Sequence, residues 1–104
     1  MIFRKFALAG AVVLATGVAA RADAIDGQWC FASSSLEIQG PRIRTPGGNE
    51  ISGNYSRHGF SYVVPANEPG SGSDVVMVLL SEEALSLTRG AAAPETWRRC
   101  KPTS

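Results

Sequence analysis

Two cysteines, each close to a tryptophan, constrain the fold of this 104-residue chain more than any other feature. Cys30 follows Trp29 directly, and Cys100 lies three residues after Trp97. If the two thiols pair, they close a loop of about 70 residues, which destabilises the unfolded chain by about 4 kcal/mol. The bond would also bring the first and last structured segments together, because disulfide partners need Cα atoms within about 7 Å.

The alternatives to a disulfide are two free thiols or a metal site. His58 is the only histidine, and two cysteines with one histidine are too few ligands for a closed zinc site. Two cysteines allow one intramolecular pairing, and a domain this small needs a covalent staple more than a large one does. We therefore expect a disulfide between Cys30 and Cys100, and no metal or other cofactor.

The first residues have the pattern of an export signal. A short basic start precedes an uncharged, mostly apolar run over residues 6–18, and small residues follow. These are the three parts of a cleaved secretory signal peptide. Cleavage is expected after Ala24, with the bond after Ala22 as the second candidate, because an Ala-x-Ala sequence precedes each. A membrane anchor is the alternative, but the run is shorter than the roughly 20 residues that span a bilayer.

Removal of residues 1–24 leaves one domain over residues 25–104. The ten basic and nine acidic residues of the chain become seven and eight, so the net charge changes from +1 to −1. No basic patch typical of nucleic-acid binding remains. We expect a periplasmic or secreted protein with no stable membrane anchor after cleavage, in an oxidising compartment where disulfides persist.

The remaining sequence alternates between apolar and polar residues in short runs separated by Gly, Pro and Asn. Such runs indicate half-buried strands, and their short connections favour an antiparallel meander. The fold class expected is all-β, a small meander of seven or eight short strands that closes as a barrel; a two-sheet sandwich would also bring the cysteines together. The strands are expected at residues 28–31, 36–38, 42–44, 51–56, 60–64, 74–81, 85–88 and 96–100.

Three segments carry separate expectations. Residues 75–80 are apolar on both faces, which predicts the most buried strand. Residues 65–73 form the longest loop, and their Gly, Pro and Ser content predicts mobility. A short helix over residues 81–87 is the main alternative to a strand there, because Glu, Ala and Leu are good helix formers.

Gly27-Gln28-Trp29 resembles the Gly-x-Trp signature of lipocalins and other calycins. The resemblance implies an up-and-down barrel in which Trp29 packs across the closed end and a basic residue of the last strand stacks on it. Arg99 or Arg98, beside Trp97, would be that residue, through a cation–π contact. The resemblance therefore places Trp29, Trp97 and Arg99 together as barrel-end packing.

The same features are similar to those of small bacterial metalloprotease inhibitors, which are exported eight-stranded barrels with one disulfide. As a whole, the chain resembles small uncharacterised exported proteins of proteobacteria, a resemblance that implies no function. The chain is about half as long as a typical lipocalin, so its strands are shorter, which argues against a deep apolar cavity.

The sequence contains no recognisable catalytic set. The single histidine lies in Arg57-His58-Gly59, where a solvated turn is expected, and no serine lies in a Gly-x-Ser-x-Gly elbow. Glu82 and Glu83 are adjacent acids in an expected polar turn, where acidic side chains are commonly just solvated. We expect that the protein is not an enzyme.

Binding is the function class that the sequence favours. Arginine and tyrosine are frequent interface anchors, although the tyrosines would alternatively fill the core while the arginines keep a sheet face soluble. We expect a non-catalytic exported protein that binds or inhibits another envelope or secreted protein, with residues 65–73 as a candidate inserting loop. The alternatives are a calycin-like small-molecule barrel and a structural or stress-related envelope protein. The candidate binding surface consists of Arg42, Arg44, Tyr55, Arg57 and Tyr62.

Overall fold

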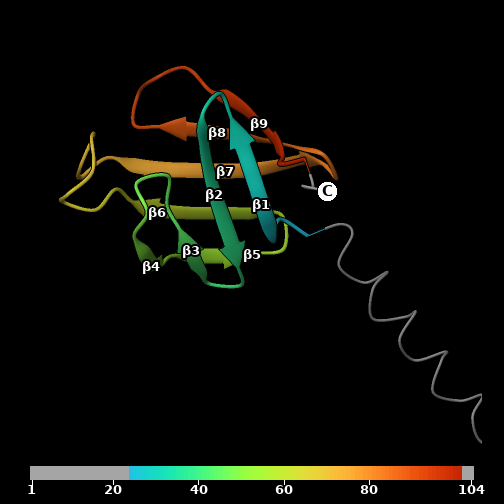
Figure 1. The fold of residues 1–104 in the computed structure, drawn as a ribbon, viewed down its shortest axis with the longest axis horizontal. Coiled ribbons are helices and arrows are strands. Elements are labelled where there is room, and N and C mark those ends of the chain that lie inside the picture. Colours follow the sequence, from blue (N-terminus) through green and yellow to red (C-terminus); the bar gives the residue numbers. More distant parts are fainter. Residues whose placement is uncertain (1–23, 102–104) are drawn as a thin grey trace, which may run out of the picture.

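The computed structural model describes residues 24–101, which form one nearly closed, barrel-like sheet of nine antiparallel strands (Figure 1). The signal peptide expected over residues 1–24 lies outside the described residues except for its last residue, Ala24. Within the described range there is no helix, and so none long and apolar enough to cross a membrane. The strands are β1 (Gly27–Phe31), β2 (Ser34–Gln39), β3 (Arg42–Arg44), β4 (Glu50–Ser52), β5 (Asn54–Ser56), β6 (Gly59–Val63), β7 (Asp74–Ser81), β8 (Ala84–Arg89) and β9 (Glu95–Arg99).

The strand order β4-β3-β2-β1-β9-β8-β7-β6-β5 shows how the sheet closes. Strands consecutive in the chain pair with each other, and the first strand also pairs with the last, β1 with β9. The two outermost strands, β4 and β5, are separated by Gly53 alone, so the chain itself joins the two edges. The predicted all-β meander is confirmed, with β4 and β5 together taking the place of the one strand expected over residues 51–56.

Gly53 lets the chain bend between β4 and β5. A Cβ at this position would lie 2.5 Å from the Phe60 ring and 2.5 Å from the backbone oxygen of Ser61. Its amide donates a hydrogen bond to the Pro41 carbonyl at 2.9 Å, which ties the bend to the turn before β3. Glycine is required here by close approach to neighbouring atoms.

The inward side chains of every strand except β4 and β5 form one core, and Ile51 of β4 packs against it. Figure 1 shows β1 and β2 crossing in front of β6, β7 and β8, so residues from both halves of the sheet meet between them. This arrangement is expected when period-two strands close on themselves, because every second side chain then faces the same interior. The core consists of Ile25, Trp29, Leu36, Ile38, Ile43, Phe60, Tyr62, Val64, Val75, Met77, Leu85, Leu87 and Trp97.

Strand β7 corrects one expectation. Val75 and Met77 are buried, but Val76 is 48% exposed and Val78 is 50% exposed. The prediction that residues 75–80 form the most buried strand is therefore wrong for one face. Strands covered on both sides are apolar on both faces, whereas a single-layer barrel has one interior and leaves the other face of every strand open.

The disulfide between Cys30 and Cys100 is present, with an S–S distance of 2.05 Å and a Cα–Cα distance of 5.0 Å. It joins β1 to the residue that follows β9, across the pairing that closes the barrel. The expected adjacency of the first and last strands is thus observed. The alternative helix over residues 81–87 does not form, because a turn after Ser81 leads directly into β8.

Candidate functional site

The best-organised polar group at one end of the barrel is the guanidinium of Arg99. Its central carbon lies 4.0 Å from the centroid of the Trp29 ring. The side chain also donates hydrogen bonds to the backbone oxygens of Glu82 and Ala24, each at 2.8 Å, and to that of Asp26. Arg99 therefore ties the N-terminal approach to β1 and the turn before β8 to the tryptophan between them.

Gly27 explains why the sequence reads Gly-x-Trp at this place. Its φ is +121°, and a Cβ would lie 2.7 Å from a terminal nitrogen of Arg99. Both facts require glycine, because an L side chain is strained at this φ and would displace the guanidinium. Burial lowers the pKa of Arg99, while the nearby carboxylates of Glu83, Asp26 and Glu82 oppose that shift.

The barrel-end set predicted from the sequence is only partly brought together. Arg99, directly opposite Trp29, is the stacking residue, whereas Arg98 points outward and is exposed. Trp97 precedes Arg99 on β9 and lies opposite Leu85. It is fully buried and stacks on Phe31, with ring centroids 5.5 Å apart. Trp97 therefore belongs to the core beside Phe31 and Leu85, whereas Arg99 stacks on Trp29.

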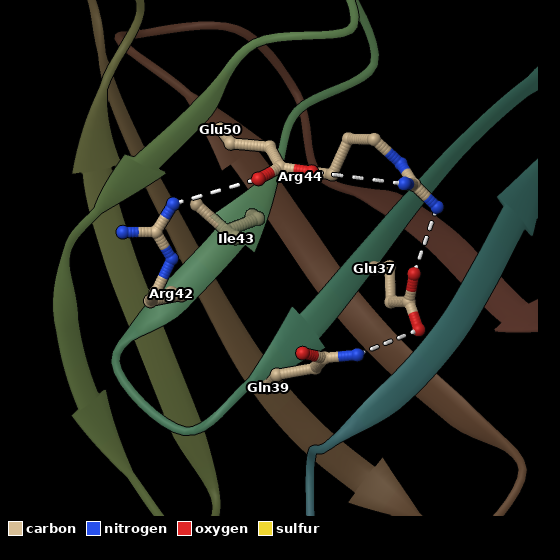
Figure 2. Close-up of a pocket in the computed structure, with 6 residues that line it drawn as sticks. All are labelled: Glu37, Gln39, Arg42, Ile43, Arg44 and Glu50. Carbon is tan, nitrogen blue, oxygen red and sulfur yellow. Dashed lines mark hydrogen bonds and ion pairs between the residues drawn. The ribbon is translucent and has the colours of Figure 1, made fainter.

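Two arginines of the candidate binding surface, Arg42 and Arg44, are paired with acids. On the outer face of β2, β3 and β4, Arg44 lies 2.8 Å from Glu37 and 3.9 Å from Glu50, and Arg42 lies 3.5 Å from Glu50 (Figure 2). Gln39 extends this row by donating to Glu37 at 3.2 Å. Exposed cross-strand ion pairs of this kind contribute about 0–1 kcal/mol. Figure 2 thus shows a solvated row of balanced charges, without an unmatched cluster of arginines.

The remaining candidate residues lie elsewhere. Tyr62 is only 6% exposed, and its burial raises its pKa to about 12, so its assignment to a binding surface is wrong. Tyr55 is exposed and donates a hydrogen bond to the carboxylate of Asp26, which raises the pKa of Tyr55. Arg57 lies in the turn between β5 and β6, where its backbone oxygen accepts a hydrogen bond from Ile25 at 2.8 Å. Burial removes Tyr62 from the set, whereas Arg42 and Arg44 line one hollow and Tyr55 and Arg57 line a second hollow that shares Glu37 and Gln39 with the first.

Asp26 organises a hollow of about 480 Å³ beside the start of β1. One carboxylate oxygen accepts the amide hydrogen of Gly40 at 2.8 Å, and the other accepts the hydroxyl of Tyr55. The hollow is open to solvent, and Arg57 and Glu37 contribute to its walls. Asp26 holds three chain segments together here, as a structural carboxylate commonly does.

The loop over residues 65–73 is tied to the turn between β3 and β4. The carboxylate of Glu68 accepts hydrogen bonds from the hydroxyl of Thr45 and from the side-chain amide of Asn49, the latter at 2.6 Å. Val64 and Ser73 close the base of the loop with a backbone hydrogen bond of 2.9 Å. The loop predicted to be mobile therefore has side-chain and backbone contacts that hold its shape.

An exposed apolar stripe was missed by the analysis of the sequence. It consists of Val63, Val76, Val78 and Leu80, all about half exposed on the outer faces of β6 and β7. Val76 and Val78 have uncharged cross-strand neighbours, Gly59 and Ser61 on β6 and Ser86 and Thr88 on β8, whereas Val63 lies opposite Asp74. The apolar run over residues 75–80 is visible in the sequence, but its exposure depends on the sheet having a single layer, which exposes every second side chain.

At its Leu80 end the apolar stripe reaches a hollow of about 440 Å³ lined by His58, Leu79, Leu80, Ser81 and Glu82. Residues 24–101 contain no group of three or more His, Cys, Asp or Glu side chains arranged to hold a metal ion. Comparison with known proteins adds no relative, since the chain matches no protein-family model, no curated protein and no solved structure.

Proposed function

We propose that this chain is a non-catalytic exported protein that binds another exported protein through the apolar stripe. The observation that carries the proposal is the outward exposure of Val63, Val76, Val78 and Leu80, in which the central Val76 and Val78 have only uncharged cross-strand neighbours. The outer face of β2 to β4 carries alternating charges instead. Contiguous exposed apolar side chains are typical of interaction sites.

The partner would lie flat on the sheet. Strand β7 is paired on both sides, with β6 and β8, so its backbone offers no free edge for an added strand. An acid flanks the apolar stripe on each side, Asp74 at the start of β7 and Glu82 directly after its end. The hollow beside Leu80 has room for an inserted side chain. These features fit a partner that presents an apolar segment with a basic residue.

A second copy of this chain is a poorer match than a different partner. A twofold interface would place the two copies of the apolar stripe against each other. A twofold axis would also place acid against acid. Antiparallel β7 strands would bring Asp74 near Glu82 of the second copy, and parallel strands would bring the two Asp74 side chains together. Like charges in register oppose association.

Other interpretations have less support. The interior of the barrel holds both tryptophans and the rest of the core, so a small-molecule site there would have to displace packed side chains. The disulfide agrees with export to an oxidising compartment. The contact of Arg99 with Trp29 beside Gly27 supports a relationship with calycins, which we keep as part of the proposal.

The test compares two lysine pairs that add the same charge to opposite sides of the barrel. Val76→Lys with Val78→Lys alters the apolar stripe, and Ser35→Lys with Ser52→Lys alters exposed, outward positions on β2 and β4. A partner recovered from periplasm with the unaltered protein is purified, and its Kd for each variant is measured. Near-ultraviolet circular dichroism establishes that both variants fold.

The proposal predicts that the stripe pair weakens binding at least about tenfold, or 1.4 kcal/mol, while the control pair binds like the unaltered protein. Equal affinity for both variants would contradict the proposal. Sedimentation of the purified protein supplies a second check. A dimer that the stripe pair dissociates and the control pair does not would show that the stripe binds a second copy instead.

A further inference from the structure

Two peptide bonds near the start of the fold satisfy the same export-processing pattern. Ala20-Arg21-Ala22 precedes one of them, and Ala22-Asp23-Ala24 precedes the other. Both provide small residues at the positions that signal peptidase requires. The sequence alone gives no reason to exclude either, so the structure around Ala24 must distinguish them.

The backbone of Ala24 is part of the barrel end. Its carbonyl oxygen accepts a hydrogen bond from Arg99 at 2.8 Å. The next residue, Ile25, is 0% exposed and belongs to the core. The amide of Ile25 donates to the Arg57 carbonyl at 2.8 Å, and its own carbonyl accepts the indole hydrogen of Trp29 at 2.8 Å. The ordered structure therefore begins no later than Ala24.

Cleavage after Ala24 would damage this arrangement in two ways. It would remove a carbonyl oxygen that the guanidinium of Arg99 uses, and it would turn the amide of Ile25 into a charged ammonium. The Ile25 nitrogen and the Ala24 oxygen are both bonded to the Ala24 carbonyl carbon, and that oxygen lies 2.8 Å from Arg99. The new ammonium charge would therefore lie about 5 Å from the guanidinium. Two positive charges at that distance repel each other, and the buried position of Ile25 weakens solvent screening.

We propose that the exported chain is cleaved between Ala22 and Asp23, so that the mature protein begins at Asp23. This position leaves the Ala24 carbonyl and the Ile25 amide intact. It also moves the new ammonium two residues away from the contact with Arg99. The inference rests on the export included in the proposed function.

The first experiment measures the mass of the mature protein. The full chain is expressed in a bacterium, recovered from the periplasm and measured intact, so that the first residue follows from the mass. A protein that begins at Asp23 supports the inference. One that begins at Ile25 overturns it while leaving export in place, and a chain that keeps its first 22 residues overturns both.

Two matched substitutions separate the sites. Ala20→Tyr places a bulky residue in the pattern before the Ala22 site alone, and Ala24→Tyr does the same for the Ala24 site alone. We expect Ala24→Tyr to give the product that begins at Asp23 and Ala20→Tyr to give none of it, because only Ala20→Tyr alters the pattern before Ala22. The reverse result would overturn the inference, and the readout is processing, which does not depend on folding.

A third measurement tests the physical reason. Proteins prepared to begin at Asp23 and at Ile25 are compared by thermal unfolding in the same buffer. The form that begins at Ile25 should melt about 5 °C or more below the other, a shift well within the range of single-site effects in a domain of this size. Equal melting temperatures would show that the contact between Ala24 and Arg99 does not distinguish the two sites.

Discussion

Replacement of Arg99 by alanine tests whether the end of the barrel depends on the guanidinium. The side chain donates to three backbone oxygens, those of Glu82, Ala24 and Asp26, and lies on the Trp29 ring. Removing it leaves those oxygens without this donor and opens one side of the indole. The neighbouring Arg98 is exposed and faces away from the interior, so Arg98→Ala is a matched control that removes the same charge.

The magnitude follows from the contacts. Hydrogen bonds from a charged donor contribute about 1.5–3 kcal/mol each, and a cation–π contact contributes about 0.5–2 kcal/mol. These terms are not additive, and water replaces part of the lost hydrogen bonding at this partly exposed end. We expect Arg99→Ala to lower the free energy of unfolding by about 3 kcal/mol, and Arg98→Ala to change it by less than about 0.5 kcal/mol.

Urea unfolding followed by tryptophan fluorescence measures both values, and Arg99→Lys refines the result. Lysine keeps the positive charge but has no planar fork, so it should recover less than half of the loss. In a domain of this size, 3 kcal/mol corresponds to a decrease in Tm of roughly 12–24 °C. Equal, small effects of Arg99→Ala and Arg98→Ala would refute the role given to this side chain.

Three further predictions follow from the closure and the core. Cys30→Ser should lower the free energy of unfolding by about 2–5 kcal/mol, as should reduction of the bond to Cys100; unchanged urea midpoints would contradict this. Gly53→Ala should lower the free energy of unfolding by about 1–3 kcal/mol through overpacking against Phe60; an unchanged value would show that the bend accommodates a Cβ. The pKa of Tyr62 is raised to about 12, so the unfolded chain loses that proton first and stability should fall between about pH 10 and pH 12. Tyr62→Phe should remove that part of the fall, and identical alkaline profiles would contradict the burial of the hydroxyl.

The alternation of apolar residues was sufficient to predict the strands and much of the core. Phe60, Tyr62 and Val64 were placed on one face, and all three are buried. The same alternation could have removed Tyr62 from the candidate binding surface, because a residue cannot both fill the interior and lie outside. The strand pattern and the general enrichment of tyrosine at interfaces gave opposite answers, and burial decided between them.

Other features depend on register and on distant contacts. Arg98 and Arg99 are adjacent and chemically identical. A shift of one residue in the pairing of β9 would exchange which of them faces Trp29. The contact of Glu68 with Thr45 joins two loops 23 residues apart, which local sequence patterns do not encode. The exposure of Val76 and Val78 follows from the number of layers in the fold, a property that a single strand does not reveal.

The central claim is that half of the most apolar strand faces solvent and forms the docking surface. Methyl NMR spectra of the purified protein, recorded with and without a soluble paramagnetic gadolinium chelate, measure this exposure directly. The methyl signals of Val76 and Val78 should broaden strongly, while those of Val75 and Met77 should remain sharp. Equal protection of all four residues would contradict the outward orientation of the apolar stripe.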